Sequence, residues 1–334
     1  MRRLMGVVLV VVGIVAIISM WGGGSLGNLG FGSGGEVDLS ERLNASEAER
    51  LRIDVRSADV RLVPTDSDEV HAQLVGYQRG FTIGSKRPEL TMRERGGAIE
   101  VSARQQSGFG LSFNDIDLIV EVPRRQWQEL AVKAGSGDLE LSELKADLLR
   151  LNTGSGDISF LELEAATGDF GTGSGHISGE QIQAENLVIK TGSGDIEMGR
   201  VYGGDASFNT GSGDIEINGY ELRQLTVNAS SGDIELQGGT AQVKGRTGSG
   251  NIDMDVAELR HDTSLHTGSG NVKVELDHEP QSLEVRYDGG SGRGSIEWDG
   301  FIQDGNSDKR IRGAFGSGEV LLEVRTGSGD FTLD

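Results

Sequence analysis

A short glycine motif recurs along this chain at nearly constant spacing. It is a Gly-Ser-Gly tripeptide, followed in most copies by an acid or amide and an aliphatic residue, and the first gaps between copies are all 19 residues. The regular copies are centred on Ser136, Ser155, Ser174, Ser193, Ser212, Ser231 (where the tripeptide reads Ser-Ser-Gly), Ser249 and Ser269, with looser copies at Ser291, Ser317 and Ser328. A fixed period of this length is typical of stacked-repeat folds, which offer extended surfaces more readily than pockets.

Apolar residues alternate with polar ones on both sides of each motif. Around Ser193 the pairs are Leu187/Ile189 before it and Ile196/Met198 after it, and most other copies follow the same pattern. A period of two predicts a strand with one buried face, and no stretch shows helical spacing over enough length. We expect the tripeptide to form a corner, because glycine accepts a positive φ without penalty.

Two folds could use this pattern, a parallel β-solenoid or an antiparallel meander. Identical sequences at identical spacing stack best when like positions lie above one another, about 4.8 Å apart, and a parallel coil achieves this. The sequence therefore favours a single-stack parallel solenoid over residues 131 to 275, with one coil per 19 residues. The expected interior column is Ile158, Ile177, Ile196, Ile215 and Ile234.

The rest of the chain divides by composition. Residues 51–63 are a degenerate copy around Ser57, and the irregular β region 36–130 is expected to cap the array. Residues 131–334 hold the repeats, and their drifting C-terminal copies predict a hairpin-like or shortened closing turn. The predicted fold class is all-β, a parallel solenoid with an irregular N-terminal cap, preceded by one transmembrane helix.

The first 21 residues predict export. Arg2 and Arg3 precede the apolar run 4–20, and Trp21 follows it. We expect residues 1–21 to be an uncleaved membrane anchor because no small-x-small site precedes Trp21; the alternative is a cleaved signal peptide. The glycine-rich residues 22–35 are a predicted tether. The expected location is the cytoplasmic membrane, single-pass, with the β domain periplasmic or extracellular.

Charge and cysteine content exclude several partners. The net charge is −21, which argues against nucleic acid, since binding phosphates requires dense Lys and Arg. The chain has no cysteine, so disulfides, cysteine-based metal sites and an acylated lipoprotein cysteine are excluded.

Acidic residues form rows along the predicted stack. Two residues after the serines lie Asp138, Asp157, His176, Asp195, Asp214, Asp233, Asn251 and Asn271. We interpret them as corner residues whose side chains accept backbone hydrogen bonds, a role that Asn fills as well as Asp. The alternative is a calcium ladder at Asp195, Asp214 and Asp233. Calcium-binding β-rolls resemble this pattern, but they have two short turns per coil, and here there is one motif per 19 residues.

No catalytic residue or cofactor site is predicted. The order Gly-Ser-Gly between two strands differs from the Gly-x-Ser-x-Gly elbow, and a catalyst does not need eight nucleophiles. No Gly-Lys-Ser/Thr follows the glycine loops, so they are not phosphate-binding loops. The scattered His176, His261, His266 and His278 are interpreted as surface histidines rather than a zinc site.

The repeated Thr-Gly-Ser-Gly-Asp-Ile, together with Leu-Ile-Val-Glu-Val-Pro at residues 118–123 and the apolar N-terminal segment, resembles the bacterial β-strand-repeat domains labelled "putative adhesins". The resemblance covers about residues 50–334. It implies a bacterial envelope protein and transfers no catalytic residue to this chain.

The function expected from these features is a non-enzymatic, acidic rod that acts as a structural, adhesin-like or binding module at the envelope. Its expected partners are the membrane, through the N-terminal segment, and an envelope polymer or protein. One alternative is a polysaccharide-active β-helix enzyme, although such enzymes cluster their carboxylates and here the acids are spread evenly. Another is an envelope-stress accessory protein.

Overall fold

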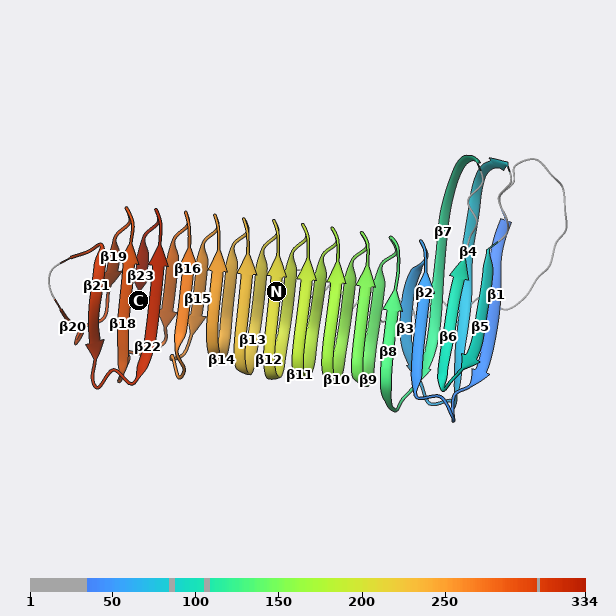
Figure 1. The fold of residues 1–334 in the computed structure, drawn as a ribbon, viewed down its shortest axis with the longest axis horizontal. Coiled ribbons are helices and arrows are strands. Elements are labelled where there is room, and N and C mark those ends of the chain that lie inside the picture. The colour runs from blue at the N-terminus through green and yellow to red at the C-terminus, as the bar shows by residue number, and fades with distance from the viewer. Residues whose placement is uncertain (1–34, 84–87, 105–108, 305–306) are drawn as a thin grey trace. The chain divides into compact units, whose positions relative to one another are not determined.

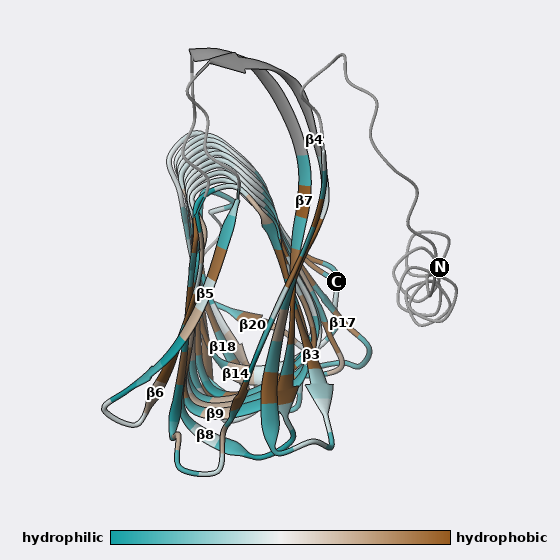
Figure 2. Cartoon of the chain, turned by 90° about the vertical axis from the view of Figure 1, so that its right-hand side faces the viewer, coloured by the Kyte–Doolittle hydropathy of each residue, from teal (hydrophilic) through white to brown (hydrophobic). Residues whose placement is uncertain are grey.

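The array at the centre of the molecule is a parallel stack. The structure, a computed structural model, describes residues 35–83, 88–104, 109–304 and 307–334, and these belong to one compact unit. Six long strands follow one another in the array (Figure 1): β9 (Leu139–Thr153), β10 (Ile158–Thr172), β11 (Ile177–Thr191), β12 (Ile196–Thr210), β13 (Ile215–Ala229) and β14 (Ile234–Thr247). Each pairs in parallel with the next, so residues 19 apart lie side by side; between β13 and β14 the spacing falls to 18 after Glu221. The coils superimpose in a view along the stack (Figure 2).

The predicted interior column is confirmed. Ile158 pairs with Ile177, Ile177 with Ile196, and the register continues to Ile234. All five isoleucines are at most 1% exposed. Full burial of such a side chain contributes about 1.5–3 kcal/mol, and one coil alone could not provide it.

Each coil has three walls. In β9 the buried positions are 139, 141, 144, 146, 149, 151 and 153. Alternate residues of a straight strand face opposite sides, so the two consecutive outward residues at 142–143, and again at 147–148, each mark a bend. We call the segments equivalent to 139–141, 144–146 and 149–153 wall 1, wall 2 and wall 3. The Gly-Ser-Gly corner joins wall 3 of one coil to wall 1 of the next.

The glycines of this corner are needed for a different reason than the sequence predicts. None of the Gly-Ser-Gly glycines of the regular copies has a positive φ. Instead, a Cβ placed on Gly194 would lie 1.9 Å from the carbonyl oxygen of Gly175 in the preceding coil. The expectation of a left-handed corner is therefore wrong for the regular copies, whereas in the looser copy around Ser317 both Gly316 and Gly318 have a positive φ, 55° and 66°. Glycine is required because the backbones of neighbouring coils approach too closely for a side chain.

The N-terminal part interleaves with the array. β2 (Arg50–Val55) and β3 (Asp59–Thr65) form the predicted degenerate coil around Ser57, with β2 beside β8 (Gln126–Lys133) and β3 beside β9. The outer layers are β6 (Ala98–Arg104), β5 (Glu89–Arg95), β7 (Phe109–Pro123), β4 (Glu69–Ile83) and β1 (Gly35–Asn44). β4 runs antiparallel to both β7 and β1, so this end closes with antiparallel strands.

The C-terminal coils are stacked out of sequence order. The short strands are β15 (Ile252–Val256), β16 (Thr263–Thr267), β17 (Val272–Leu276), β18 (Leu283–Gly289), β19 (Gly294–Ile296), β20 (Ile302–Gln303), β21 (Arg310–Phe315), β22 (Val320–Thr326) and β23 (Phe331–Leu333). β22 lies between β16 and β18, and β23 lies between β17 and β19. The coil of β22 and β23 is thus inserted between the coil of β16 and β17 and the coil of β18 and β19, although it comes after both in the sequence. β21 closes the edge of the stack by pairing antiparallel with β18.

The fold-class prediction is wrong in its transmembrane helix. The part of the chain that the structure describes is built of strands, and it contains no helix long and apolar enough to cross a bilayer. The predicted segment 1–21 and nearly all of the predicted tether 22–35 lie outside the described residues.

Candidate functional site

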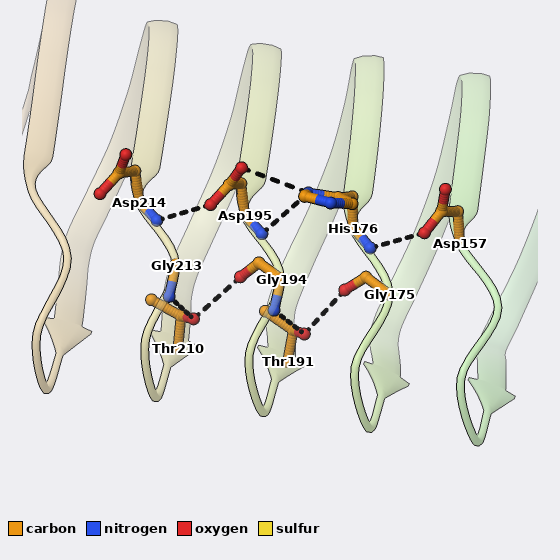
Figure 3. Close-up of polar contacts among 9 residues, drawn as sticks. All are labelled: Asp157, Gly175, His176, Thr191, Gly194, Asp195, Thr210, Gly213 and Asp214. Atoms are coloured by element: carbon orange, nitrogen blue, oxygen red, sulfur yellow. Dashed lines mark hydrogen bonds and ion pairs between the residues drawn. The ribbon is translucent and has the colours of Figure 1, made fainter.

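A ladder of hydrogen bonds joins the aspartates of successive corners (Figure 3). Asp195 Oδ1 accepts a bond from the Asp214 backbone N–H at 2.9 Å. One coil later, Asp214 Oδ1 accepts a bond from the Asp233 N–H at 2.8 Å. Asp233 Oδ1 in turn accepts from the Asn251 N–H at 2.7 Å. The predicted corner role is confirmed, and the bond runs to the next coil rather than within the same turn.

The same ladder tolerates other side chains. Asn251 Oδ1 accepts the Asn271 N–H at 2.9 Å, so an amide replaces the carboxylate. The His176 backbone N–H donates to Asp157 Oδ1 at 2.8 Å, and His176 Nδ1 accepts the Asp195 N–H at 3.1 Å. Among the described residues no group of three His, Asp or Glu side chains is arranged to hold a metal ion.

We expect the protein to fold without calcium. In the variant with Asp195, Asp214 and Asp233 all replaced by Asn, the amide oxygens can accept the same backbone bonds, so the melting temperature should change little. Thermal melting in calcium and in EDTA measures this. Unfolding of the native protein in EDTA, with recovery in micromolar calcium, would show instead that the three carboxylates are ligands.

A second, buried ladder lies behind the first. Thr191 Oγ1 donates to the Gly175 carbonyl at 2.8 Å and accepts the Gly194 N–H at 3.1 Å, and Thr210 repeats the arrangement one coil later (Figure 3). Each threonine thus satisfies two backbone groups of the corner that would otherwise be buried without a partner. The coil around Ser231 has Ala229 at this position.

Replacing Thr191 by valine should lower the free energy of unfolding by about 2 kcal/mol, because an isosteric side chain leaves a buried carbonyl and N–H unsatisfied. The opposite change, Ala229→Thr, should raise it by about 1 kcal/mol, since it completes the ladder. Urea unfolding of the two variants measures both changes in the free energy of unfolding. Equal effects of both changes in the same direction would contradict the role of the hydroxyl.

Wall 1 carries a dense acidic row. Glu197, Glu216, Glu235 and Asp253 lie side by side on four successive coils. Asp253 is exposed, but partial desolvation by the neighbouring coils raises the pKa of its carboxyl, and the charges of Glu235 and Asp233 raise it further. This row is a continuous anionic surface, and its charges are spaced by the stacking of the coils.

Three residues of the N-terminal sheet form a hydrogen-bonded chain that the sequence did not reveal. Ser40 Oγ lies 3.0 Å from His71 Nε2, and His71 Nδ1 lies 3.3 Å from Glu121 Oε2. The order matches that of a hydrolase triad. However, the trio lies across β1, β4 and β7 and lines neither of the two hollows described below, and a hydrolase also needs fixed donors for the oxyanion. No signal in the sequence links these residues, because they are far apart in the chain.

Among the described residues, two hollows on the outer faces bear on function. The larger, of about 400 Å³, lies on β2, β5 and β6 around Thr91 and Ser102, whose hydroxyls are 3.1 Å apart. Its rim is charge-balanced: Arg52, Arg93 and Arg104 against Asp54, Glu89 and Glu100.

The smaller hollow, of about 270 Å³, lies on wall 1 between the degenerate coil and the coil around Ser174. We call it the wall 1 hollow. One row of its lining is formed by Asp59, Asp138, Asp157 and His176 of the corner ladder. The second row is Arg61, Glu140, Ser159 and Ser178. It is thus lined by carboxylates, hydroxyls, one imidazole and the guanidinium of Arg61.

The match to a family model decides which family the chain belongs to. The model described as Toastrack DUF4097 matches residues 48–203 and again residues 172–334. The chain belongs to the toastrack DUF4097 family. The resemblance to adhesin-like repeat domains inferred from the sequence is confirmed, and toastrack membership supports a structural or adhesin-like module.

Two solved structures are similar to this toastrack protein. A "putative cell adhesion protein" of Clostridium sporogenes is 11% identical over 90% of this chain and 99% of its own, with a TM-score of 0.22. A "putative adhesin" of Parabacteroides distasonis is 10% identical over 89% of this chain and 97% of its own, with a TM-score of 0.29. At such low scores neither likeness carries an argument about function. No curated protein matches the toastrack chain.

Proposed function

We propose that this toastrack protein is a non-enzymatic, adhesin-like binding module that acts at the bacterial envelope. The observation that carries the proposal is the parallel array itself, in which β9 to β14 pair residue by residue. Such a stack presents rows of identical or similar side chains along flat walls, a geometry suited to an extended partner.

Export is part of the proposal, and it is supported by Arg2 and Arg3 ahead of the apolar run 4–20. The net charge of −21 supports a partner other than nucleic acid or an anionic lipid surface. The expected partner is therefore a polymer or protein of the envelope.

Beads coated with the full chain test the proposal. They should attach to isolated envelope fragments, whereas beads coated with heat-unfolded chain should not. Equal attachment of both bead types would overturn the binding module. Steady release of reducing ends from the fragments by the purified chain would favour the rival, a polysaccharide-active enzyme.

A further inference from the structure

The wall 1 hollow lies where the repeat departs from its own pattern. Four residues after the motif serine, Glu140, Glu197 and Glu216 project from wall 1, but the two coils between the first two have Ser159 and Ser178. The neighbouring coils accommodate glutamate at this outward position, so packing does not demand serine here. The small side chains open the hollow.

A third departure adjoins the same hollow. His176 stands in the corner ladder where the flanking coils have Asp157 and Asp195. The histidine reproduces the structural bond, because Nδ1 accepts the Asp195 N–H at 3.1 Å. The ladder is therefore kept while the chemistry exposed to the hollow changes. In the tautomer in which Nδ1 accepts this bond, Nε2 carries the ring proton and is a donor. Asp195 Oδ2 also lies 3.3 Å from Nδ1.

The lining offers both donors and acceptors to a ligand. Asp59, Asp138 and Asp157 each use Oδ1 to accept a backbone N–H of the next coil. Among the described residues, their Oδ2 atoms and the hydroxyls of Ser159 and Ser178 make no internal hydrogen bond. Closely spaced acceptors and hydroxyls of this kind match the vicinal hydroxyls of a sugar.

The charge of the hollow selects among sugars. Asp59, Asp138, Asp157 and Glu140 outnumber one cation, Arg61, which is already paired with Glu140 at 3.1 Å and with Asp117 at 3.6 Å. A positively charged ligand is favoured at such a site. A metal ion is disfavoured because the described side chains form no cluster that could hold one.

We propose that the wall 1 hollow binds an amino sugar, a saccharide unit whose amine is free and protonated. The amine lies among the Asp oxygens, and the sugar hydroxyls bond to Ser159, Ser178 and His176 Nε2–H. This site deepens the proposed function, on which it rests, by giving the binding module a ligand class.

Titration calorimetry of the full chain tests the proposal with three probes: a β-1,4-linked glucosamine tetramer, the corresponding N-acetylglucosamine tetramer and spermidine. The glucosamine tetramer should bind at least tenfold more tightly than either other probe. Equal binding of the acetylated tetramer would overturn the requirement for the amine. Equal binding of spermidine would reduce the site to unspecific attraction of a polycation.

The most informative variant restores the glutamates of the neighbouring coils at positions 159 and 178. Ser159→Glu combined with Ser178→Glu fills the hollow and adds two negative charges, so a specific site loses at least tenfold in affinity, whereas unspecific attraction of a cation increases. Ser159→Gln with Ser178→Gln fills the hollow without charge and must weaken binding too. The matched control, Glu197→Ser with Glu216→Ser, changes wall 1 outside the hollow and should leave the affinity within about twofold. The melting temperature of each variant verifies that it is folded.

The two proposals fail separately. If the coated beads attach to envelope fragments but the glucosamine tetramer does not bind, or binds the Glu variant as tightly as the native chain, the amino-sugar site is refuted and the binding module stands. Failure of the beads together with tight, Ser-dependent binding of the tetramer would refute the module alone.

Discussion

Replacing Gly194 by alanine should destabilise the array by about 3 kcal/mol, at the upper end of the cost of overpacking. The added Cβ would lie 1.9 Å from the Gly175 carbonyl oxygen and 2.5 Å from its carbon, and backbone atoms cannot rotate away as a side chain can. Relief requires two coils to separate, which weakens the strand pairing around them. Urea unfolding and hydrogen exchange of the adjoining coils measure the effect.

The matched control is Gly192→Ala, on the other side of the same serine. Its Cβ would lie 2.3 Å from the Gly173 carbonyl oxygen, yet the equivalent position in the coil around Ser231 is occupied by Ser230. The Ser230 N–H bonds to the Thr210 carbonyl at 3.2 Å, so the corner accommodates a side chain there. We expect a smaller loss, about 1 kcal/mol. A loss as large as that of Gly194→Ala would contradict the difference between the two sites.

Replacing Ile196 by aspartate should lower the free energy of unfolding by more than about 4 kcal/mol. The Ile196 side chain is fully buried, so the change would place an unpaired charge in the core. Burial raises the pKa of the new carboxyl above its unfolded value, so the protonated form is favoured in the folded state. The penalty is therefore full at pH values above this raised pKa and shrinks as the pH falls through it. Urea unfolding of the aspartate variant at pH 8 and at pH 5 measures how much of the lost free energy of unfolding returns at the lower pH.

The conservative change Ile196→Val serves as the control and should cost about 0.5–1.5 kcal/mol at both pH values. A pH-independent loss in the aspartate variant would mean that the carboxyl reaches water. The coil would then have opened rather than buried the charge.

The register of the array could be predicted because one local rule is repeated. An alternation of apolar residues and a spacing of 19 between Ile177 and Ile196 leave one parallel register that buries every such position. The corner role of Asp195 could be predicted for the same reason, since each coil repeats it. The direction of its bond, into the next coil, could not, because spacing does not state which backbone lies closest.

The order of the C-terminal coils could not be predicted from the sequence, because two copies of the motif fit the same position. The copies around Ser291 and Ser328 both have a corner and apolar flanks, so either could stack on the coil around Ser269. Between these two copies the chain forms β20 and β21, and β21 pairs antiparallel with β18, an arrangement that the repeat pattern does not predict. The wall 1 hollow could not be predicted for the opposite reason. It forms where Ser159 and Ser178 depart from the repeat pattern, and a prediction from the repeat rests on positions that follow the pattern.

The inserted coil also bears on how the protein is made. β18 leaves the ribosome before β22, but in the finished fold β22 separates it from β16. While synthesis proceeds, residues 283–296 therefore lack their native neighbour β22, and β16 lacks its native neighbour until residues 320–333 arrive. An open edge recruits other strands, so a product that stops short of residue 320 would expose an aggregation-prone surface. The out-of-order stacking thus makes the synthesis of residues 320–333, rather than that of residues 283–296, the step that completes this part of the stack.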